Sequence, residues 1–104
     1  MDGASIVRSA NARKDVRDLY VWIVEYSGLE RAELIIARIE RAVHRLARRP
    51  LSGRPRPDLK GEPRSFPVPP WLIVYEPLED RAGIHLLRII DNRRDVAALL
   101  GKKS

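Results

Sequence analysis

The stretch RSFPVPPWLIVYEPLEDRAGIHLLRIIDNRRD, residues 64–95, decides the fold. Residues 71–76 and 84–90 are apolar on both alternating faces, which is typical of central strands. Residues 64–68 predict a third strand at an edge position, because Pro67 has no amide hydrogen to donate to a neighbouring strand. An acidic hairpin loop joins the two central strands and a basic segment follows the second. We therefore expect a small sheet with charged groups gathered around its end.

A short strand and a helix are expected at the beginning of the chain. Residues 5–8 are β-like, but so short a segment can only be an edge or partner strand. Apolar residues then recur at spacings of three and four, which predicts an amphipathic helix over about residues 10–26. Ser9 or Asn11 can cap the start of this helix.

A second helix is predicted over about residues 29–49, where Pro50 ends it. Gly28 can end the first helix, and Ser27 and Glu30 have the spacing of a capping box that starts the second. Two helices separated by so few residues predict an antiparallel helical hairpin.

The order of these elements is strand, two helices, three strands and a short final helix. We expect an α+β fold of two layers, with the helical hairpin packed on a small antiparallel sheet. Residues 51–63, rich in Pro and Gly, predict an ordered surface loop. Asn92 is expected to cap the final helix, which includes Val96 and Leu100. The length fits a single domain over residues 1–104.

The charge of the chain indicates an acidic partner. It carries 20 Lys and Arg against 14 Asp and Glu, a net charge of +6, and only four of the basic residues are lysine. Arginine pairs in a planar, bidentate manner with phosphates and carboxylates, so nucleic acid, a nucleic-acid machine or an acidic protein segment would suit it. The alternative is that arginine reflects a GC-rich genome and a solvated surface.

Cysteine is absent, which excludes disulfides, thiolate metal sites and a cysteine nucleophile. The chain shows no signal-peptide pattern and no apolar run of membrane-spanning length, so we expect a cytoplasmic protein without a membrane partner. His44 and His85 lie at no metal-ligand spacing and are interpreted as a surface residue and a packed residue. We expect no metal and no cofactor.

Arginines supply the candidate binding site. The predicted target-binding residues are Arg64, Arg88, Arg93 and Arg94. With Lys60 they could form one cationic concavity for phosphates or carboxylates. Arginine keeps its proton, so this set alone is a poor general acid–base pair. The alternative is internal pairing, of Arg94 with Asp91 or Asp95 and of Arg88 with Glu76.

From about Ile6 to Leu100 the chain resembles the RelE/ParE superfamily of type II toxin–antitoxin toxins. The resemblance rests on the order and spacing of several segments: Leu46–Pro50, Gly53–Pro55, Arg64–Val68, Leu72–Tyr75, Leu87–Ile90 and Arg93–Asp95. It implies a toxin that causes growth arrest, is associated with plasmid stabilisation, and is neutralised by an antitoxin encoded beside it.

The superfamily implies two mechanisms. RelE-like members cleave messenger RNA on the ribosome, and Arg64 and Arg88 match positions where such members hold phosphate-contacting arginines. ParE-like members inhibit DNA gyrase and are not known for a catalytic site. This chain has Asp91-Asn92 where the nuclease pattern has His-Gly, and residues 96–104 offer no Tyr or His. We therefore expect a ParE-like gyrase inhibitor rather than an enzyme. The alternatives are a ribosome-dependent mRNA endonuclease and an inactive protein that only binds an antitoxin.

The resemblance also implies a ParD-like antitoxin that wraps an acidic segment around the toxin in a hetero-oligomer. The predicted receivers are an apolar flank and the basic face of the second helix: Trp22, Arg38, Arg41 and Arg45. Opposite charges would mainly speed and orient that association.

Overall fold

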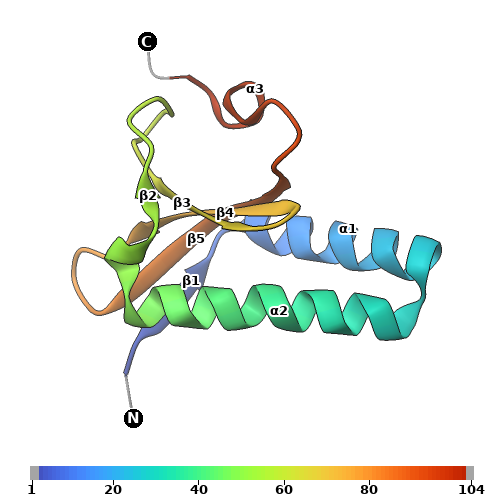
Figure 1. The fold of residues 1–104 in the computed structure, drawn as a ribbon. Coiled ribbons are helices and arrows are strands. Elements are labelled where there is room, and N and C mark those ends of the chain that lie inside the picture. Colours follow the sequence, from blue (N-terminus) through green and yellow to red (C-terminus); the bar gives the residue numbers. More distant parts are fainter. Residues whose placement is uncertain (1–2, 103–104) are drawn as a thin grey trace.

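The computed structural model describes residues 3–102, and every structural statement below concerns these residues. Figure 1 shows a helical hairpin beside a twisted sheet, with a short helix on the other side. The elements are β1 (Ser5–Arg8), α1 (Ala10–Ser27), α2 (Leu29–Arg48), the 3₁₀ turn η1 (Pro50–Ser52), β2 (Arg54–Pro55), β3 (Arg64–Val68), β4 (Trp71–Pro77), β5 (Gly83–Asp91) and α3 (Val96–Leu100). The predicted α+β class and helical hairpin are confirmed.

The sheet has five strands in the order β1-β5-β4-β3-β2, so the doubly apolar β4 lies at its centre, as predicted. β2, β3, β4 and β5 pair antiparallel, but β1 runs parallel to β5. The prediction of an antiparallel sheet is therefore right for four strands and wrong for β1. Residues 5–8 are too short to carry a signal of direction. The direction is fixed by tertiary structure, because β1 leads directly into α1, which continues along β5.

The helix ends follow the predicted chemistry only in part. The Ser9 hydroxyl accepts a hydrogen bond from the amide of Ala12 and caps α1. Gly28, at φ +90°, is the one residue between the two long helices, and no side chain caps α2. The capping box predicted from Ser27 was wrong, because Ser27 is already in the last turn of α1 and cannot take the extended N-cap conformation.

The predicted cap of the final helix was also wrong. Asp95, not Asn92, caps α3 and accepts a hydrogen bond from the amide of Ala98 at 3.1 Å. Asn92 lies instead in the turn that follows β5, where the amide of Arg94 donates to the carbonyl of Asp91.

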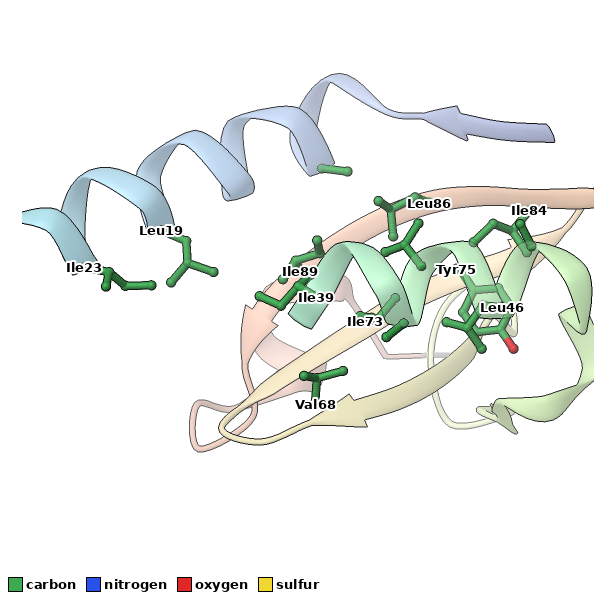
Figure 2. Close-up of a cluster of buried hydrophobic side chains, with 14 of the residues drawn as sticks. Leu19, Ile23, Ile39, Leu46, Val68, Ile73, Tyr75, Ile84, Leu86 and Ile89 are labelled. Carbon is green, nitrogen blue, oxygen red and sulfur yellow. The ribbon is translucent and has the colours of Figure 1, made fainter. Parts of the chain in front are cut away.

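Both faces of the sheet are covered, which explains why its central strands are apolar on both sides. Side chains of α1 and α2 pack on one face, and Figure 2 shows this core, which includes Leu19, Ile23, Ile39, Leu46, Val68, Ile73, Tyr75, Ile84, Leu86 and Ile89. A smaller cluster on the other face places α3 over the sheet, and consists of Leu72, Val74 and Ile90 packed with Leu87, Val96, Leu99 and Leu100.

The connector between α2 and β3 is more structured than the predicted loop, since it contains η1 and β2. The buried Tyr75 hydroxyl donates to the carbonyl of Pro50 at 2.7 Å and accepts from the amide of Gly53 at 2.8 Å. Arg64 donates to the carbonyls of Leu51 and Gly53 at 3.2 and 2.8 Å. A Cβ atom at residue 53 would overlap the Tyr75 ring, so this approach requires glycine. Two side chains of the sheet therefore hold the connector in place.

No helix among residues 3–102 is long and apolar enough to cross a membrane. The remaining residues of the predicted 1–104 domain, 1–2 and 103–104, lie outside the described part of the chain.

Candidate functional site

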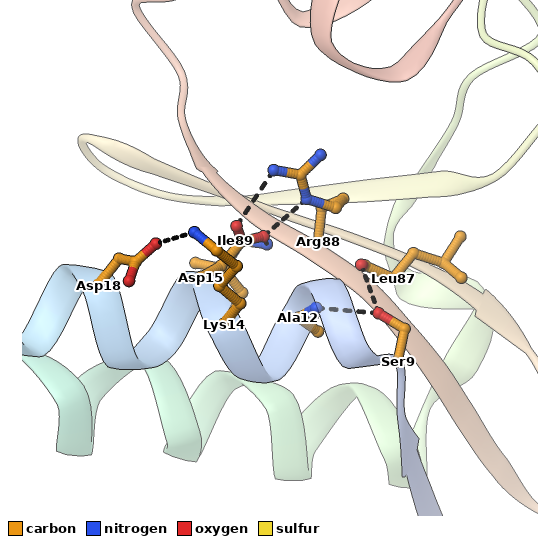
Figure 3. Close-up of polar contacts among 8 residues, drawn as sticks. All are labelled: Ser9, Ala12, Lys14, Asp15, Asp18, Leu87, Arg88 and Ile89. Carbon is orange, nitrogen blue, oxygen red and sulfur yellow. Dashed lines mark hydrogen bonds and ion pairs between the residues drawn. The ribbon is translucent and has the colours of Figure 1, made fainter.

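One wall of the site is α1. Where β1 ends, the start of this helix forms hydrogen bonds with the edge of β5 that β1 leaves unpaired. The amide of Ser9 donates to the carbonyl of Leu86 at 3.0 Å, and its hydroxyl donates to the carbonyl of Leu87 at 2.8 Å. Nearly two turns further, the Asp15 carboxylate accepts from the amide of Ile89 at 2.9 Å (Figure 3). Ser9 and Asp15 thus form hydrogen bonds with β5 in the place of a neighbouring strand, and these bonds hold α1 against the end of β5.

Arg88 is held by the same carboxylate. Its Nε donates to Oδ2 of Asp15 at 2.8 Å and its Nη2 donates to Oδ1 at 3.1 Å (Figure 3). The two side chains are only 24% and 14% exposed, so water screens the pair weakly. The hydrogen bonds that the Arg88 guanidinium donates to Asp15 raise its pKa above the usual value. Arg88 therefore ties α1 to β5.

The predicted pairing of Arg88 with Glu76 was wrong. A register irregularity in the β4–β5 pair sets Arg88 opposite Val74, whereas Glu76 is opposite His85. Glu76 Oε1 lies 3.2 Å from Nδ1 of His85 instead. A β-bulge of this kind shifts every later side chain on the strand, and the alternating pattern of the sequence does not reveal where it falls.

Three of the four predicted target-binding arginines line one groove of about 350 Å³ between α1 and the end of the sheet. Its lining is basic, acidic and apolar, and comprises Asp15, Asp18, Leu19, Trp22, Trp71, Arg88, Ile89, Ile90, Asp91, Arg93 and Arg94. Arg93 and Arg94 are exposed, unlike Arg88.

Asp91 is bound by Arg93, and the Asp95 side chain caps α3, so the alternative in which Arg94 pairs with Asp91 or Asp95 was wrong. The Arg93 side chain donates to both Asp91 carboxylate oxygens at 2.9 and 2.7 Å, and the Arg93 amide donates at 2.9 Å. These hydrogen bonds lower the pKa of Asp91 to about 2, and those from the Arg93 side chain contribute most. Asp91 is thus a carboxylate at neutral pH and a poor proton acceptor.

Arg64 and Lys60 do not join this groove, so the predicted single concavity was wrong. β3 and β5 both run antiparallel to β4, and the start of β3 therefore lies away from the end of β5. Arg64 stands opposite Tyr75, whereas the end of β5 is opposite Trp71. The basic side chains that sequence analysis combined belong to two separate surfaces.

A second groove of about 320 Å³ adjoins the first and shares Trp22, Trp71 and Arg93 with it. Arg38 lines this second groove, opposite the Pro69-Pro70 turn between β3 and β4. Two of the four predicted antitoxin-binding residues, Trp22 and Arg38, are therefore brought together.

The apolar surface near Trp22 is larger than the sequence analysis indicated. Trp22 is 51% exposed and its ring centroid lies 5.1 Å from that of Tyr26, which is 71% exposed. Further exposed apolar residues follow towards the tip of the hairpin and beyond it: Val21, Leu29 and Leu34. An exposed apolar cluster with a charged border is typical of a protein-binding surface. The sequence could have indicated this surface, because several apolar residues lie near the tip of the helical hairpin, away from the sheet that would bury them.

Arg41 and Arg45, the other two predicted antitoxin-binding residues, line a shallow depression on α2 with Ala37, Glu40, His44 and Arg48. The Arg45 guanidinium carbon lies 5.7 Å from the centroid of the Phe66 ring, at the distance of a cation–π contact. The basic face of α2 thus extends from the Trp22 groove towards β3.

The carboxylates that line the two grooves are all engaged in ion pairs. Asp15, Asp18 and Asp91 each pair with a basic side chain, in the case of Asp18 with Lys14 at 2.7 Å. Neither histidine lines either of the two grooves around Trp22. Among residues 3–102, no group of three or more His, Asp or Glu could hold a metal ion.

Comparison with known proteins agrees with this description. Residues 6–96 match the family described as the ParE toxin of the type II toxin–antitoxin system parDE. Toxin ParE3 of Caulobacter vibrioides is 34% identical over 99 residues, which cover 95% of this chain and 97% of that protein. A structure described as the chromosomal ParDE TA system from P. aeruginosa has a TM-score of 0.70 at 22% identity, and the match covers 88% of this chain and 98% of that one. The chain therefore belongs to the ParE family of type II toxins.

Proposed function

We propose that this toxin acts by binding DNA gyrase and that a cognate acidic antitoxin neutralises it in the cytoplasm. One observation carries the proposal: the groove beside Arg88 contains exposed cations and an aromatic surface, but each of its carboxylates is already paired. Such a groove can hold a protein partner by charge and burial, and its paired carboxylates are poor proton acceptors.

The antitoxin is proposed to bind around Trp22. Exposed Trp and Tyr side chains are effective anchors, because they bury a large area with little loss of conformational entropy. An amphipathic segment could place apolar residues against Trp22 and Tyr26 and carboxylates against Arg38. Arg41 and Arg45 continue the cationic face along α2, and they would attract and orient the same acidic segment.

The gyrase contact is proposed at Arg93 and Arg94, the exposed arginines beyond β5. Arg88 supports them indirectly, because its bond to Asp15 fixes α1 against β5, the strand that precedes them. Arg64 contributes to the stability of the connector rather than to this groove.

The alternative of an mRNA endonuclease would use Arg64 and Arg88 as phosphate-contacting residues. Arg64 is absent from the groove that Arg88 lines, and each guanidinium is occupied by partners within the chain. The third alternative, an inactive protein that binds only an antitoxin, would keep the Trp22 surface and lack any effect on gyrase.

A supercoiling assay with purified gyrase tests the proposal. The toxin should inhibit supercoiling or accumulate cleaved DNA, and the Arg93→Glu/Arg94→Glu variant should lose this effect. Arg17→Glu/Arg81→Glu removes the same charge elsewhere and should keep it, since both residues are exposed and line neither groove. Cleavage of messenger RNA in a translation extract by a sample without effect on gyrase would contradict the proposal.

A further inference from the structure

A second basic surface lies along the β2 edge of the sheet, separate from the grooves around Trp22. Between residues 48 and 64 the chain has six Lys or Arg and two Asp or Glu, so a net charge of +4 out of +6 falls in this short segment. We call its basic side chains the basic rim: Arg48, Arg49, Arg54, Arg56, Lys60 and Arg64.

The fold holds the basic rim in an ordered arrangement. Arg54 lies opposite Ser65 in the β2–β3 pair, and Arg56 donates to the Ser65 hydroxyl at 3.3 Å. Beyond β2 the chain continues towards the C-terminal segment (Figure 1), where the amide of Lys60 donates to the carbonyl of Gly101 at 3.1 Å. The rim therefore extends from the end of α2 along the sheet edge to the C-terminal segment, on backbone fixed by hydrogen bonds.

The positive charge of the rim is only partly neutralised within the chain. Arg56 is paired with Asp58 at 2.9 Å, and Arg64 is anchored on the carbonyls of the connector. Arg49, Arg54 and Lys60 are exposed. Exposed cations held on an ordered edge can neutralise phosphates without a large loss of conformational entropy.

The surroundings of the rim favour a nucleic-acid duplex over an acidic peptide. Leu51 is the one exposed large apolar side chain between residues 49 and 64, whereas tight binding of a helix requires a cluster of apolar anchors. That cluster exists around Trp22 instead. Contacts to a duplex backbone need only cations and other donors in a shallow surface.

The rim also lacks the features of a site for single strands. Proteins that bind single-stranded nucleic acid stack bases on exposed aromatic rings. The nearby rings are engaged, because Tyr75 is buried and Phe66 lies beneath Arg45. A stacking platform is therefore missing from the described part of this edge.

From this charge and this shape we infer that the basic rim binds the phosphate backbone of duplex DNA without sequence preference. The choice of DNA over duplex RNA rests on the proposed gyrase function. The toxin would then hold gyrase by the groove at one end of β5 and the DNA by the opposite edge of the sheet. The DNA contact belongs to the chain itself and needs no gyrase to be detected.

Fluorescence anisotropy with a labelled 25-base-pair duplex of mixed sequence tests the inference on the whole chain alone. Arg54→Gln/Lys60→Gln should weaken binding by more than tenfold near 0.1 M salt. It should also reduce the slope of log K against log salt by about 1.8, because each phosphate contact contributes about 0.9. The matched Arg17→Gln/Arg81→Gln variant loses the same charge away from the rim and should keep both affinity and slope. Circular dichroism and the urea midpoint establish that each variant is folded.

Three outcomes would overturn the inference. Equal loss in the rim variant and in the matched variant would mean that net charge alone attracts DNA. Absence of salt-dependent binding by the folded wild-type chain would remove the DNA contact. Binding of a Glu-rich peptide at the rim, in competition with the duplex and at lower concentration, would assign the rim to an acidic protein. The supercoiling assay remains independent, so gyrase inhibition with no binding of free DNA refutes only this inference.

Discussion

Replacement of Asp15 by alanine should loosen the junction between α1 and β5 on which the groove depends. The wild-type carboxylate accepts three hydrogen bonds, two from the Arg88 guanidinium and one from the amide of Ile89. The substitution removes all three at once. It leaves a largely buried guanidinium and a backbone donor without these partners.

The expected cost follows from the environment of the pair. Removing one partner of a fully buried ion pair costs about 3–5 kcal/mol. The Arg88 and Asp15 side chains are 24% and 14% exposed and line an open groove, so water can replace part of what is lost. We therefore expect the free energy of unfolding to fall by about 2–3 kcal/mol, which for a domain of this size lowers Tm by roughly 8–15 °C.

Urea unfolding followed by circular dichroism measures this change. Asp15→Asn keeps an acceptor for the Ile89 amide and should cost less than Asp15→Ala. The matched control is Asp18→Ala, because Asp18 forms only an exposed pair with Lys14 on the same helix and should cost less than about 0.5 kcal/mol. A double-mutant cycle with Arg88→Gln isolates the coupling between the two side chains.

A loss below about 0.5 kcal/mol in Asp15→Ala would refute the reasoning, since an exposed ion pair between residues i and i+4 of a helix contributes about as much. A coupling energy near zero would show that Asp15 and Arg88 stabilise the chain independently. In either case Arg88 would be free to contact a target directly.

Three further predictions follow from the same contacts. The pKa of the Asp91 carboxyl should be about 2 in an NMR titration, and Arg93→Ala should return it towards 3.8. Because folding lowers this pKa, the stabilisation is complete above about pH 4 and is lost as the pH falls through 2. A pKa near 3.8 in the wild type would contradict the pairing. Tyr75→Phe should lower the free energy of unfolding by about 1–3 kcal/mol, because the Gly53 amide loses its acceptor, and an unchanged urea midpoint would mean that water replaces the hydroxyl. Trp22→Ala should weaken antitoxin binding by at least tenfold in calorimetry, whereas Leu51→Ala, an exposed apolar residue that lines neither groove, should have little effect; equal affinities of the two variants would exclude the Trp22 groove as the centre of the interface.

The helices and central strands were accessible from the sequence because each follows a local rule. Spacing of apolar residues gave α1 and α2 within about a turn of their bounds, and doubly apolar runs identified β4 and β5. The exposure of Trp22 agrees with its predicted place on an accessible apolar flank. These properties depend on residues close together in the chain.

The arrangement of the charged groups was not accessible, because it depends on the direction and register of strands. Arg64 was grouped with Arg88 although β3 and β5 point the same way and separate them. The partner of Arg88 is Asp15, 73 residues away, and no local pattern connects them. Two other predictions failed by a shift of a residue or two. The register irregularity in the β4–β5 pair sets the partners of Arg88 and Glu76, and the single glycine between the two long helices leaves no room for the predicted capping box.

Supercoiling by purified DNA gyrase, measured with and without the folded toxin, tests the central claim most directly. The account predicts loss of supercoiling or accumulation of cleaved DNA, restored by the antitoxin and abolished in Arg93→Glu/Arg94→Glu. Normal supercoiling at toxin concentrations far above those of gyrase, with a sample that still binds its antitoxin, would contradict it.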